Sequence, residues 1–192
     1  MKQKEYIEKH IATHTVHSAE DRSAVSYLES VLNPEGRICT SFSCDDKWPN
    51  HDGFFEYVVP PLEGFWWQEN IDGGNYADKD SFNWISVIRL PEFISQKDFE
   101  WAVETATKKK KIDCSSAEFL TIDEGLCVQI MHLGAFDDEP TTVALMDAYL
   151  EQNGYVNDMS KDRLHHEIYL SDARKVAPEK WKTVIRHPVK KV

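Results

Sequence analysis

Hydrophobic and polar positions along residues 82–192 follow the periods of short strands and helices. Residues 82–90 are mostly apolar, which predicts a strand buried on both faces or nearly so. The predicted elements from that point are a strand at 82–90, a helix from the Ser95 cap to about Lys109, strands at 118–122 and 126–133, a helix from about 137 to 153, and strands at 165–171 and 181–189. This order predicts an α+β fold, a mostly antiparallel sheet with helices gathered on one face.

The ends of the second helix are marked by residue type. Acidic residues at 137–139 and Pro140 are typical of a first turn, and Gly154 fits a left-handed C-cap. The lysine run 108–111 falls where cations favour the carboxyl end of the first helix, so it does not indicate a nucleic-acid site.

The N-terminal pattern is less regular. Residues 20–32 predict a helix with one apolar stripe, ended by 33–36, and strands are expected at 37–43 and 54–59.

Composition narrows the function classes. The 192 residues suffice for one domain or two small ones, and the net charge of −11 argues against nucleic-acid or anionic-membrane partners but suits a cationic or neutral ligand. The N-terminus is polar and no apolar run reaches the length of a membrane span, so we expect a cytoplasmic protein.

Cysteine usage does not indicate a metal centre. Of four cysteines, Cys39 and Cys44 lie near His51, but their spacing is wrong for paired-cysteine zinc sites and no second pair follows. We therefore expect reduced thiols, no metal and no cofactor.

The sharpest chemical signal is the alternation of His165, Glu167 and Tyr169 in a predicted strand. Alternate side chains share one face, so an imidazole, a carboxylate and a phenol would line one wall. Such a Glu could attract a cation or act as an acid–base group, whereas the plainer alternative is an exposed polar sheet face.

Two other segments supply candidate ligand contacts. Trp66 and Trp67 cannot both face one core from a strand, so one is expected to meet solvent or ligand, unless it merely covers the sheet edge. His132 is a further candidate, although a histidine on the apolar face of Leu126 is more often structural. No nucleophile elbow or phosphate loop is present.

The region from about residue 57 resembles a known family. The resembling runs are 59–67 (VPPLEGFWW), 88–93 (IRLPEF), 123–134 (DEGLCVQIMHLG), 136–140 (FDDEP), 166–175 (HEIYLSDARK) and 182–186 (KTVIR). In this order they resemble the GyrI-like small-molecule-binding proteins, which are related to the effector-binding domains of multidrug-responsive regulators.

The resemblance implies two strand–helix–strand–strand modules about a pseudo-twofold axis, with an aromatic-lined cleft between them. It implies that the cleft binds lipophilic, planar aromatic or cationic compounds, for sequestration or sensing. It places the central glutamate at Glu167, its partner tyrosine at Tyr169 and the tryptophan wall at Trp66 and Trp67; Glu63 and His132 complete the candidate ligand contacts.

An enzymatic reading stays open beside binding. Some stand-alone members resembling this chain hydrolyse the cyclopropane of DNA-alkylating natural products, which implies that Glu167 and Tyr169 activate a water. A third alternative is a charge mimic that inhibits a partner enzyme, for which 137–139 is the tight acidic cluster. The sequence decides neither ligand nor oligomeric state.

The N-terminal region departs from the family pattern. The weak strand at 10–16 stands where the family begins with an apolar strand, so residues 1–56 are expected to form an atypical half-module before the GyrI-like region 57–192. Residues 20–58 also faintly resemble a nuclease-like domain, but Val58 occupies the place of the required lysine, which disfavours nuclease activity.

Overall fold

The computed structural model describes residues 7–13, 55, 58–69, 81–111 and 113–192, as two compact units that we treat separately. The first unit contains residues 61–87 and 123–192, and the second contains residues 8–60 and 88–122. The described part of the first unit carries the expected cluster of His165, Glu167 and Tyr169.

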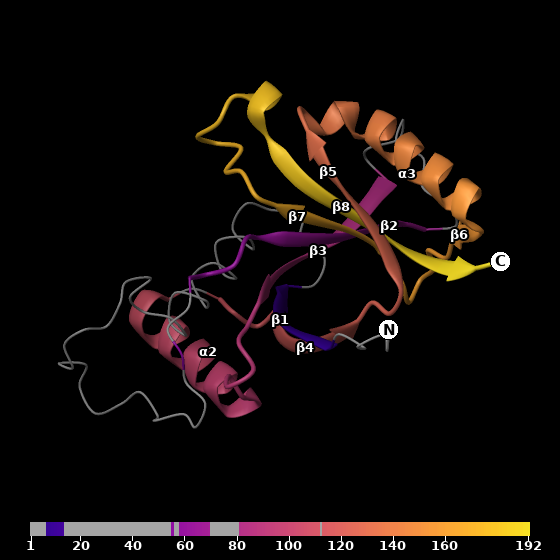
Figure 1. The fold of residues 1–192 in the computed structure, drawn as a ribbon. Helices are drawn as coiled ribbons and strands as arrows, with labels where there is room; N and C mark the ends of the chain where they lie inside the picture. Colours follow the sequence, from indigo (N-terminus) through magenta and orange to yellow (C-terminus); the bar gives the residue numbers. More distant parts are fainter. Residues whose placement is uncertain (1–6, 14–54, 56–57, 70–80, 112) are drawn as a thin grey trace. The chain divides into compact units, whose positions relative to one another are not determined.

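An antiparallel sheet forms the first unit (Figure 1). Its strands are β2 (Glu63–Gln68), β3 (Phe82–Arg89), β5 (Cys127–Leu133), β6 (Tyr155–Asn157), β7 (His165–Tyr169) and β8 (Lys182–Lys191). The order is β3-β2-β7-β8-β5, and β6 pairs with β8 off this path. Strand β7 therefore lies in the middle of the sheet, between β2 and β8.

The helix α3 (Glu139–Asn153) covers one face of β5 and β8 in this unit (Figure 1). Val143 and Met146 of α3 pack on Ile185 of β8, with Val128 and Ile130 of β5 against them. The short helix η2 (Phe136–Asp138) leads into α3, and a second, η3 (Pro178–Lys180), precedes β8.

The boundaries of α3 follow from its terminal residues. Pro140 occupies the first turn, where a missing N–H costs no hydrogen bond, and Gly154 ends the helix at φ 72°. Glycine has no Cβ to oppose that left-handed conformation, so its place in the sequence favours the turn into β6.

The second unit contains α2 (Gln96–Lys110), β4 (Ala117–Asp123) and β1 (Ile7–Thr13), and β4 neighbours β1. The backbone N–H and hydroxyl of Ser95 donate to Asp98 Oδ2 at 2.7 and 2.6 Å, which caps the start of α2. Phe99 of α2 contacts Phe119 of β4 with ring centroids 5.9 Å apart, so the apolar side of the helix packs on this strand.

The structure confirms the α+β class, the antiparallel sheet and the order of elements from residue 82 onward. Strand β6 was not expected, and the strand predicted at 54–59 is wrong at residues 55, 58 and 59, which are not extended into a sheet. The helix predicted at 20–32 and the strand at 37–43 lie outside the described residues. Within the described ranges, no helix is both long and apolar enough to cross a membrane.

Candidate functional site

Strand β7 sends alternate side chains to opposite faces of the sheet, and each face carries its own polar cluster. His165, Glu167 and Tyr169 point to one face, and His166 and Ile168 to the other, as the strand period requires. Ile185, the cross-strand partner of Glu167, packs on α3. We therefore call the sheet face that carries His165, Glu167 and Tyr169 the α3 face, and the opposite sheet face the His166 face.

Hydrogen bonds join the α3-face cluster into one chain. The Tyr169 hydroxyl donates to Glu167 Oε2 at 2.7 Å and accepts from Trp66 Nε1 at 2.9 Å. On its other oxygen, Glu167 is 2.9 Å from His165 Nε2. His165 Nδ1 lies 2.7 Å from His187 Nε2 of β8, so the chain spans three neighbouring strands.

The Glu167 carboxylate sets one donor of this chain. It only accepts, so His165 donates to it from Nε2, and His165 Nδ1 shares a second hydrogen bond with His187 Nε2. His187 Nδ1 lies 3.5 Å from the side-chain amide nitrogen of Asn157. Burial and the nearby His165 lower the pKa of His187 to about 3, which agrees with a neutral ring.

Two carboxyl groups meet on this face with opposite protonation. Burial raises the pKa of Glu139 to about 9, reinforced by the charge of Glu167 and a hydrogen bond to it. For Glu167 burial also acts to raise the pKa, but the hydrogen bond from His165, the electrostatic interaction with His165 and the hydrogen bond from Tyr169 together outweigh it and hold the pKa below its ordinary value. Glu167 is therefore the anion and Glu139 the neutral acid.

Several aromatic rings gather near Tyr169. Trp66, which is hydrogen-bonded to the Tyr169 hydroxyl, stacks on Trp84 of β3 at 5.3 Å and meets Phe82 edge-on at 6.2 Å. Phe136 meets the Tyr169 ring edge-on at 5.9 Å and lies tilted against Trp181 at 4.6 Å. The carboxylate of Glu167 is thus bordered by apolar, polarisable surface.

Gly64 makes room for the Trp66–Tyr169 contact. It pairs with Glu167 across β2 and β7, so any side chain there would enter the α3 face. A Cβ on Gly64 would lie 2.8 Å from both Trp66 Nε1 and the Tyr169 hydroxyl. Glycine at this position is what lets the indole reach the phenol.

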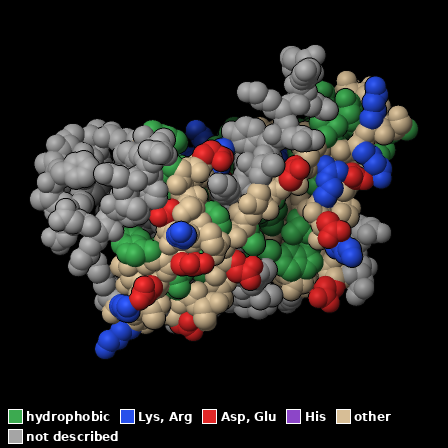
Figure 2. All heavy atoms as spheres, turned by 90° about the horizontal axis from the view of Figure 1, so that it is seen from below, with side chains coloured by type: hydrophobic (Ala, Val, Ile, Leu, Met, Phe, Trp, Pro, Cys, Tyr) green, Lys and Arg blue, Asp and Glu red, His purple; other side chains and the backbone are tan. Residues whose placement is uncertain are grey.

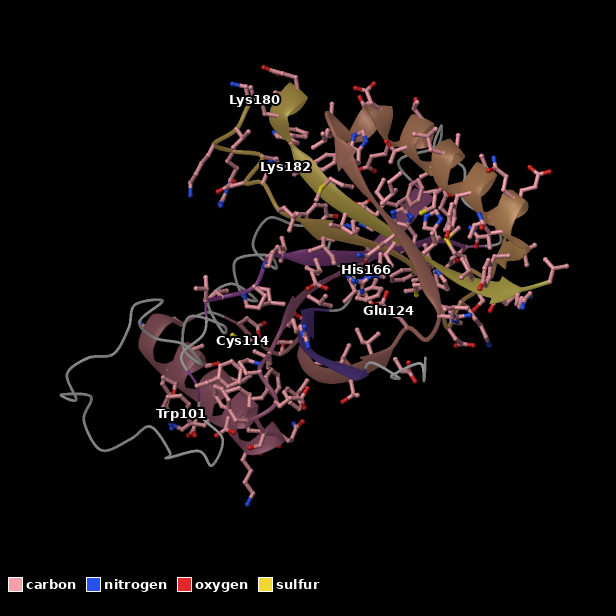
Figure 3. The ribbon with its side chains drawn as sticks, viewed as in Figure 1. Trp101, Cys114, Glu124, His166, Lys180 and Lys182 are labelled. Atoms are coloured by element: carbon pink, nitrogen blue, oxygen red, sulfur yellow. The ribbon has the colours of Figure 1, made fainter. Side chains whose placement is uncertain are left out.

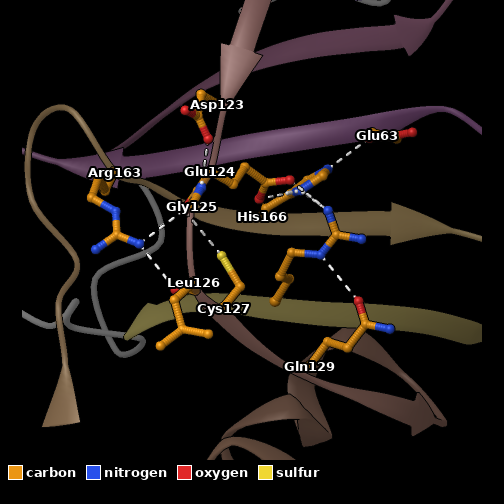
Figure 4. A network of polar contacts seen from close by, with 10 residues as sticks. Glu63, Asp123, Glu124, Gly125, Leu126, Cys127, Gln129, Arg163 and His166 are labelled. Atoms are coloured by element: carbon orange, nitrogen blue, oxygen red, sulfur yellow. Dashed lines mark hydrogen bonds and ion pairs between the residues drawn. The ribbon is translucent and has the colours of Figure 1, made fainter. Parts of the chain in front are cut away.

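The His166 face carries a separate ionic cluster around a fully buried imidazole (Figure 4). His166 Nε2 is 2.8 Å from Glu63 Oε2, and its Nδ1 is 2.9 Å from Glu124 Oε1. Arg186 pairs with the other oxygen of Glu124 and donates from Nε to Gln129 at 3.1 Å. Figure 3 shows Glu124 and His166 side by side, although 42 residues separate them.

Charge balances within this second cluster. Burial lowers the pKa of His166, but bonds to Glu124 and Glu63 outweigh it and raise the pKa above its ordinary value. Burial tends to raise the pKa of Glu124, yet His166 and Arg186 hold it low. Two carboxylates thus face an imidazolium and a guanidinium, and Phe65 stacks on His166 at 4.0 Å.

The structure brings together only part of the residue set expected from sequence. Trp66, Glu167 and Tyr169 are hydrogen-bonded to one another, and His165 joins them. Glu63 and Trp67 fall on the other face, because they alternate with Gly64 and Trp66 along β2.

His132 has the geometry of the structural alternative. Its Nδ1 lies 2.8 Å from the Thr142 hydroxyl of α3, and its Nε2 lies 2.9 Å from the Ala135 carbonyl oxygen. Since the carbonyl can only accept, Nε2 donates to it. These bonds tie β5 to the start of α3, close to Glu139.

Several residues of the α3 face were missed from sequence. They are Trp84, Phe136, Glu139, Trp181 and His187. Glu139 stood in an acidic helix start and was assigned to the helix dipole, whereas it is buried at 5% exposure. The run Phe136–Pro140 was a signal in the family resemblance that could have indicated it.

The described cysteines are poor nucleophiles. Burial raises the pKa of Cys127 to about 11 and also raises the pKa of Cys114. Cys39 and Cys44 lie outside the described residues. In the part of the chain that the structure describes, no group of three or more His, Cys, Asp or Glu side chains could hold a metal ion.

Comparison with solved structures gives matches over most of the chain. A crystal structure of an uncharacterized conserved protein from Listeria innocua is 36% identical, with TM-score 0.81, over 96% of this chain and 88% of that one. A hydrolase from Listeria innocua is 35% identical, with TM-score 0.77, over the same shares. The C-terminal domain of EcmrR, 13% identical with TM-score 0.52 over 97% of this chain and 93% of that one, shares the fold alone.

A family profile covers most of the sequence. No match was found among curated proteins. The profile described as the GyrI-like small molecule binding domain matches residues 44–190, in agreement with the resemblance of the sequence motifs. The chain therefore belongs to the GyrI-like small molecule binding domain family.

Proposed function

We propose that the chain binds lipophilic planar aromatic compounds, including cations, on the α3 face, for sequestration or sensing. The observation that carries this proposal is the anionic Glu167, only 8% exposed, hydrogen-bonded to Tyr169 beside the stacked rings of Trp66 and Trp84. Membership in a small-molecule-binding family supports the same assignment.

The physics of such a site favours delocalised cations. Indole faces attract positive charge, and a desolvated carboxylate adds a stronger attraction than a hydrated one. Neutral planar ligands retain the stacking contribution and the burial of apolar area. The ring surfaces therefore favour ligands of planar shape, and Glu167 favours ligands of positive charge.

Hydrolysis is the second candidate, favoured by the 2.7 Å contact between Tyr169 and Glu167 and by the similarity to a hydrolase. In a ring-opening hydrolysis, water oxygen bonds to the electrophilic carbon while the strained carbon–carbon bond breaks. The electron pair of the broken bond stays on the ligand, and Glu167 accepts a proton from the attacking water. Tyr169 holds the carboxylate in position for that transfer.

Tryptophan fluorescence tests the proposal. Titration with planar aromatic compounds, cationic and neutral, should give saturable quenching, and mass spectrometry of the recovered ligand then separates the candidates. An unchanged mass indicates a binder, and addition of one water indicates a hydrolase. Full turnover by Glu167→Gln would exclude the hydrolytic role of this residue, and no quenching by any compound would remove the proposal.

Charge mimicry receives less support. Glu139 of the expected acidic cluster is buried, which leaves Asp137 and Asp138 exposed. On the face shown in Figure 2, acidic side chains stand among hydrophobic and basic ones and do not merge into one surface.

We also propose the two-module arrangement for the fold. The elements β5, α3, β7 and β8 occur in the order strand–helix–strand–strand, with β6 inserted. β1 followed by β2 and β3 supports residues 1–56 as part of a first module before the region 57–192.

A further inference from the structure

Two buried polar atoms of the α3 face have no hydrogen-bond partner among the described residues: Glu139 Oε1 and Ser86 Oγ. Glu139 is 5% and Ser86 1% exposed. Ser86 pairs with Gly64 across β3 and β2, and Gly64 pairs with Glu167, so all three lie on one face. Buried groups without partners cost about 1–3 kcal/mol each, which makes their coincidence on this face informative.

The surroundings of Glu139 contain several charged or titratable groups. Glu167 and Tyr169 of β7 interact with it, and Asp137 of η2 adds a further negative charge. His165 and His187, on β7 and β8, are linked to this carboxyl through the hydrogen-bond chain of Glu167. The amino end of α3 favours an anion here, but the desolvation and the two negative neighbours oppose it.

The protein leaves the Glu139 carboxyl without a cation of its own. Among the described residues no Lys or Arg pairs with Glu139 or Glu167, whereas Glu124 on the His166 face has Arg186. A buried carboxyl without a counter-charge holds its proton. A positive ligand beside Glu167 would supply the missing counter-charge.

We propose that Glu139 is a second ligand-responsive carboxyl, which shares one proton with Glu167 in the free protein and releases it when a planar aromatic cation binds. This inference rests on the proposed function and adds a ligand class to it. A neutral planar ligand stacks on the same rings but brings no charge, so the proton stays. The site thus distinguishes cations from neutral ligands through a proton exchanged with solvent.

Proton release coupled to binding makes the cation affinity depend on pH. One proton released per bound cation raises the cation affinity by up to about tenfold per pH unit while Glu139 remains protonated in the free protein. The affinity for a neutral ligand has no such slope from this source.

Isothermal titration calorimetry at pH 7.5 in phosphate and in Tris measures the proton count directly. The matched probes are N-methylphenanthridinium, a planar cation, and phenanthridine, which is neutral at that pH. We expect close to one proton released for the cation and none for the neutral ring. The Glu139→Gln variant should bind the cation with no proton release, and Asp138→Asn, which alters an exposed neighbouring carboxylate, should keep the release of the unaltered protein.

Cation binding without proton release, or equal release from Glu139→Gln, overturns the inference while the proposed function stands. Binding of neither probe counts against the proposed function and its cation preference together. The carboxyl ¹³C resonance of Glu139 in the free protein needs neither ligand nor variant: protonation retained at pH 7 supports proton sharing, and an ionised carboxyl at that pH overturns it.

Discussion

The α3 face and the His166 face begin on adjacent residues of one strand, yet their polar clusters differ in charge balance. On the His166 face, Glu63 and Glu124 are matched by His166 and Arg186. On the α3 face, Glu167 is an anion that accepts hydrogen bonds from His165 and Tyr169, and Glu139 has an oxygen without a partner among the described residues.

The difference indicates different roles. A balanced, hydrogen-bonded cluster satisfies its own groups and gains nothing from a ligand, so its contribution is to folding. An unbalanced cluster bordered by aromatic rings is less stable alone and is improved by a positive partner. The contrast predicts that substitutions on the His166 face mainly lower the stability of the fold, whereas substitutions on the α3 face mainly lower ligand affinity.

The largest expected effect comes from His166→Ala. It leaves the buried Glu63 and the half-buried Glu124 with one fewer cation and no donor between them, so the free energy of unfolding should fall by about 3–5 kcal/mol. Urea unfolding followed by circular dichroism measures this.

The adjacent His165→Ala is the matched control on the α3 face. It removes the hydrogen bonds of His165 to Glu167 and His187 and should cost about 1–2 kcal/mol. Equal losses in the two variants would contradict the proposed division between the faces.

Gly64→Ala adds one methyl group but should disrupt the α3 face strongly. Its Cβ meets two atoms at 2.8 Å, both in packed aromatic side chains, so Trp66 and Tyr169 must separate. We expect a loss of about 1–3 kcal/mol in stability from overpacking and a larger relative loss of ligand quenching.

Gly154→Ala is a control for backbone effects, because a Cβ there contacts nothing within 4 Å while φ is 72°. Unaltered ligand quenching in Gly64→Ala would show that the Trp66–Tyr169 contact is dispensable.

The charged state of His166 predicts how stability varies with pH. Its folded pKa is raised, so its stabilisation is fully present below the ordinary histidine pKa of about 6.5 and is lost as the pH rises through the folded value. The pKa of Glu124 is lowered, so its contribution is present above its ordinary value and is lost as the pH falls through the folded value.

Urea unfolding of the unaltered protein and His166→Gln between pH 5 and 9 tests the sign. The difference in unfolding free energy should shrink as the pH rises. Both proteins keep Glu139, whose raised pKa also reduces stability at higher pH, so the difference isolates His166. Parallel profiles would mean that His166 is not an imidazolium in the fold.

Local patterns predicted much of this fold because its elements carry their own signals. The cap at Ser95, Pro140 and Gly154 fixed the ends of two helices, and alternation in β7 predicted that Glu167 and Tyr169 share a face. Such features depend on residues a few positions apart.

The site was predicted less completely because its contacts join distant parts of the chain. Trp66 and Tyr169 are 103 residues apart, and so are Glu63 and His166. Burial of Glu139 depends on how α3 lies on the sheet, which the acidic pattern 137–139 does not encode. The same pattern is typical of an ordinary exposed helix start.

The smallest effect, and the finest test of the comparison, concerns the adjacent tryptophans of β2. Trp66→Phe removes the Nε1 donor of the Tyr169 hydroxyl and part of the stack on Trp84, so ligand affinity should fall by about tenfold, with a modest loss of stability. Trp67→Phe keeps that face intact, and affinity should stay within about twofold. Since each substitution removes one fluorophore, calorimetry rather than quenching should compare them. Equal affinity losses would show that ligand contacts reach both faces of β2, and the separation of stability from binding along this strand would then fail.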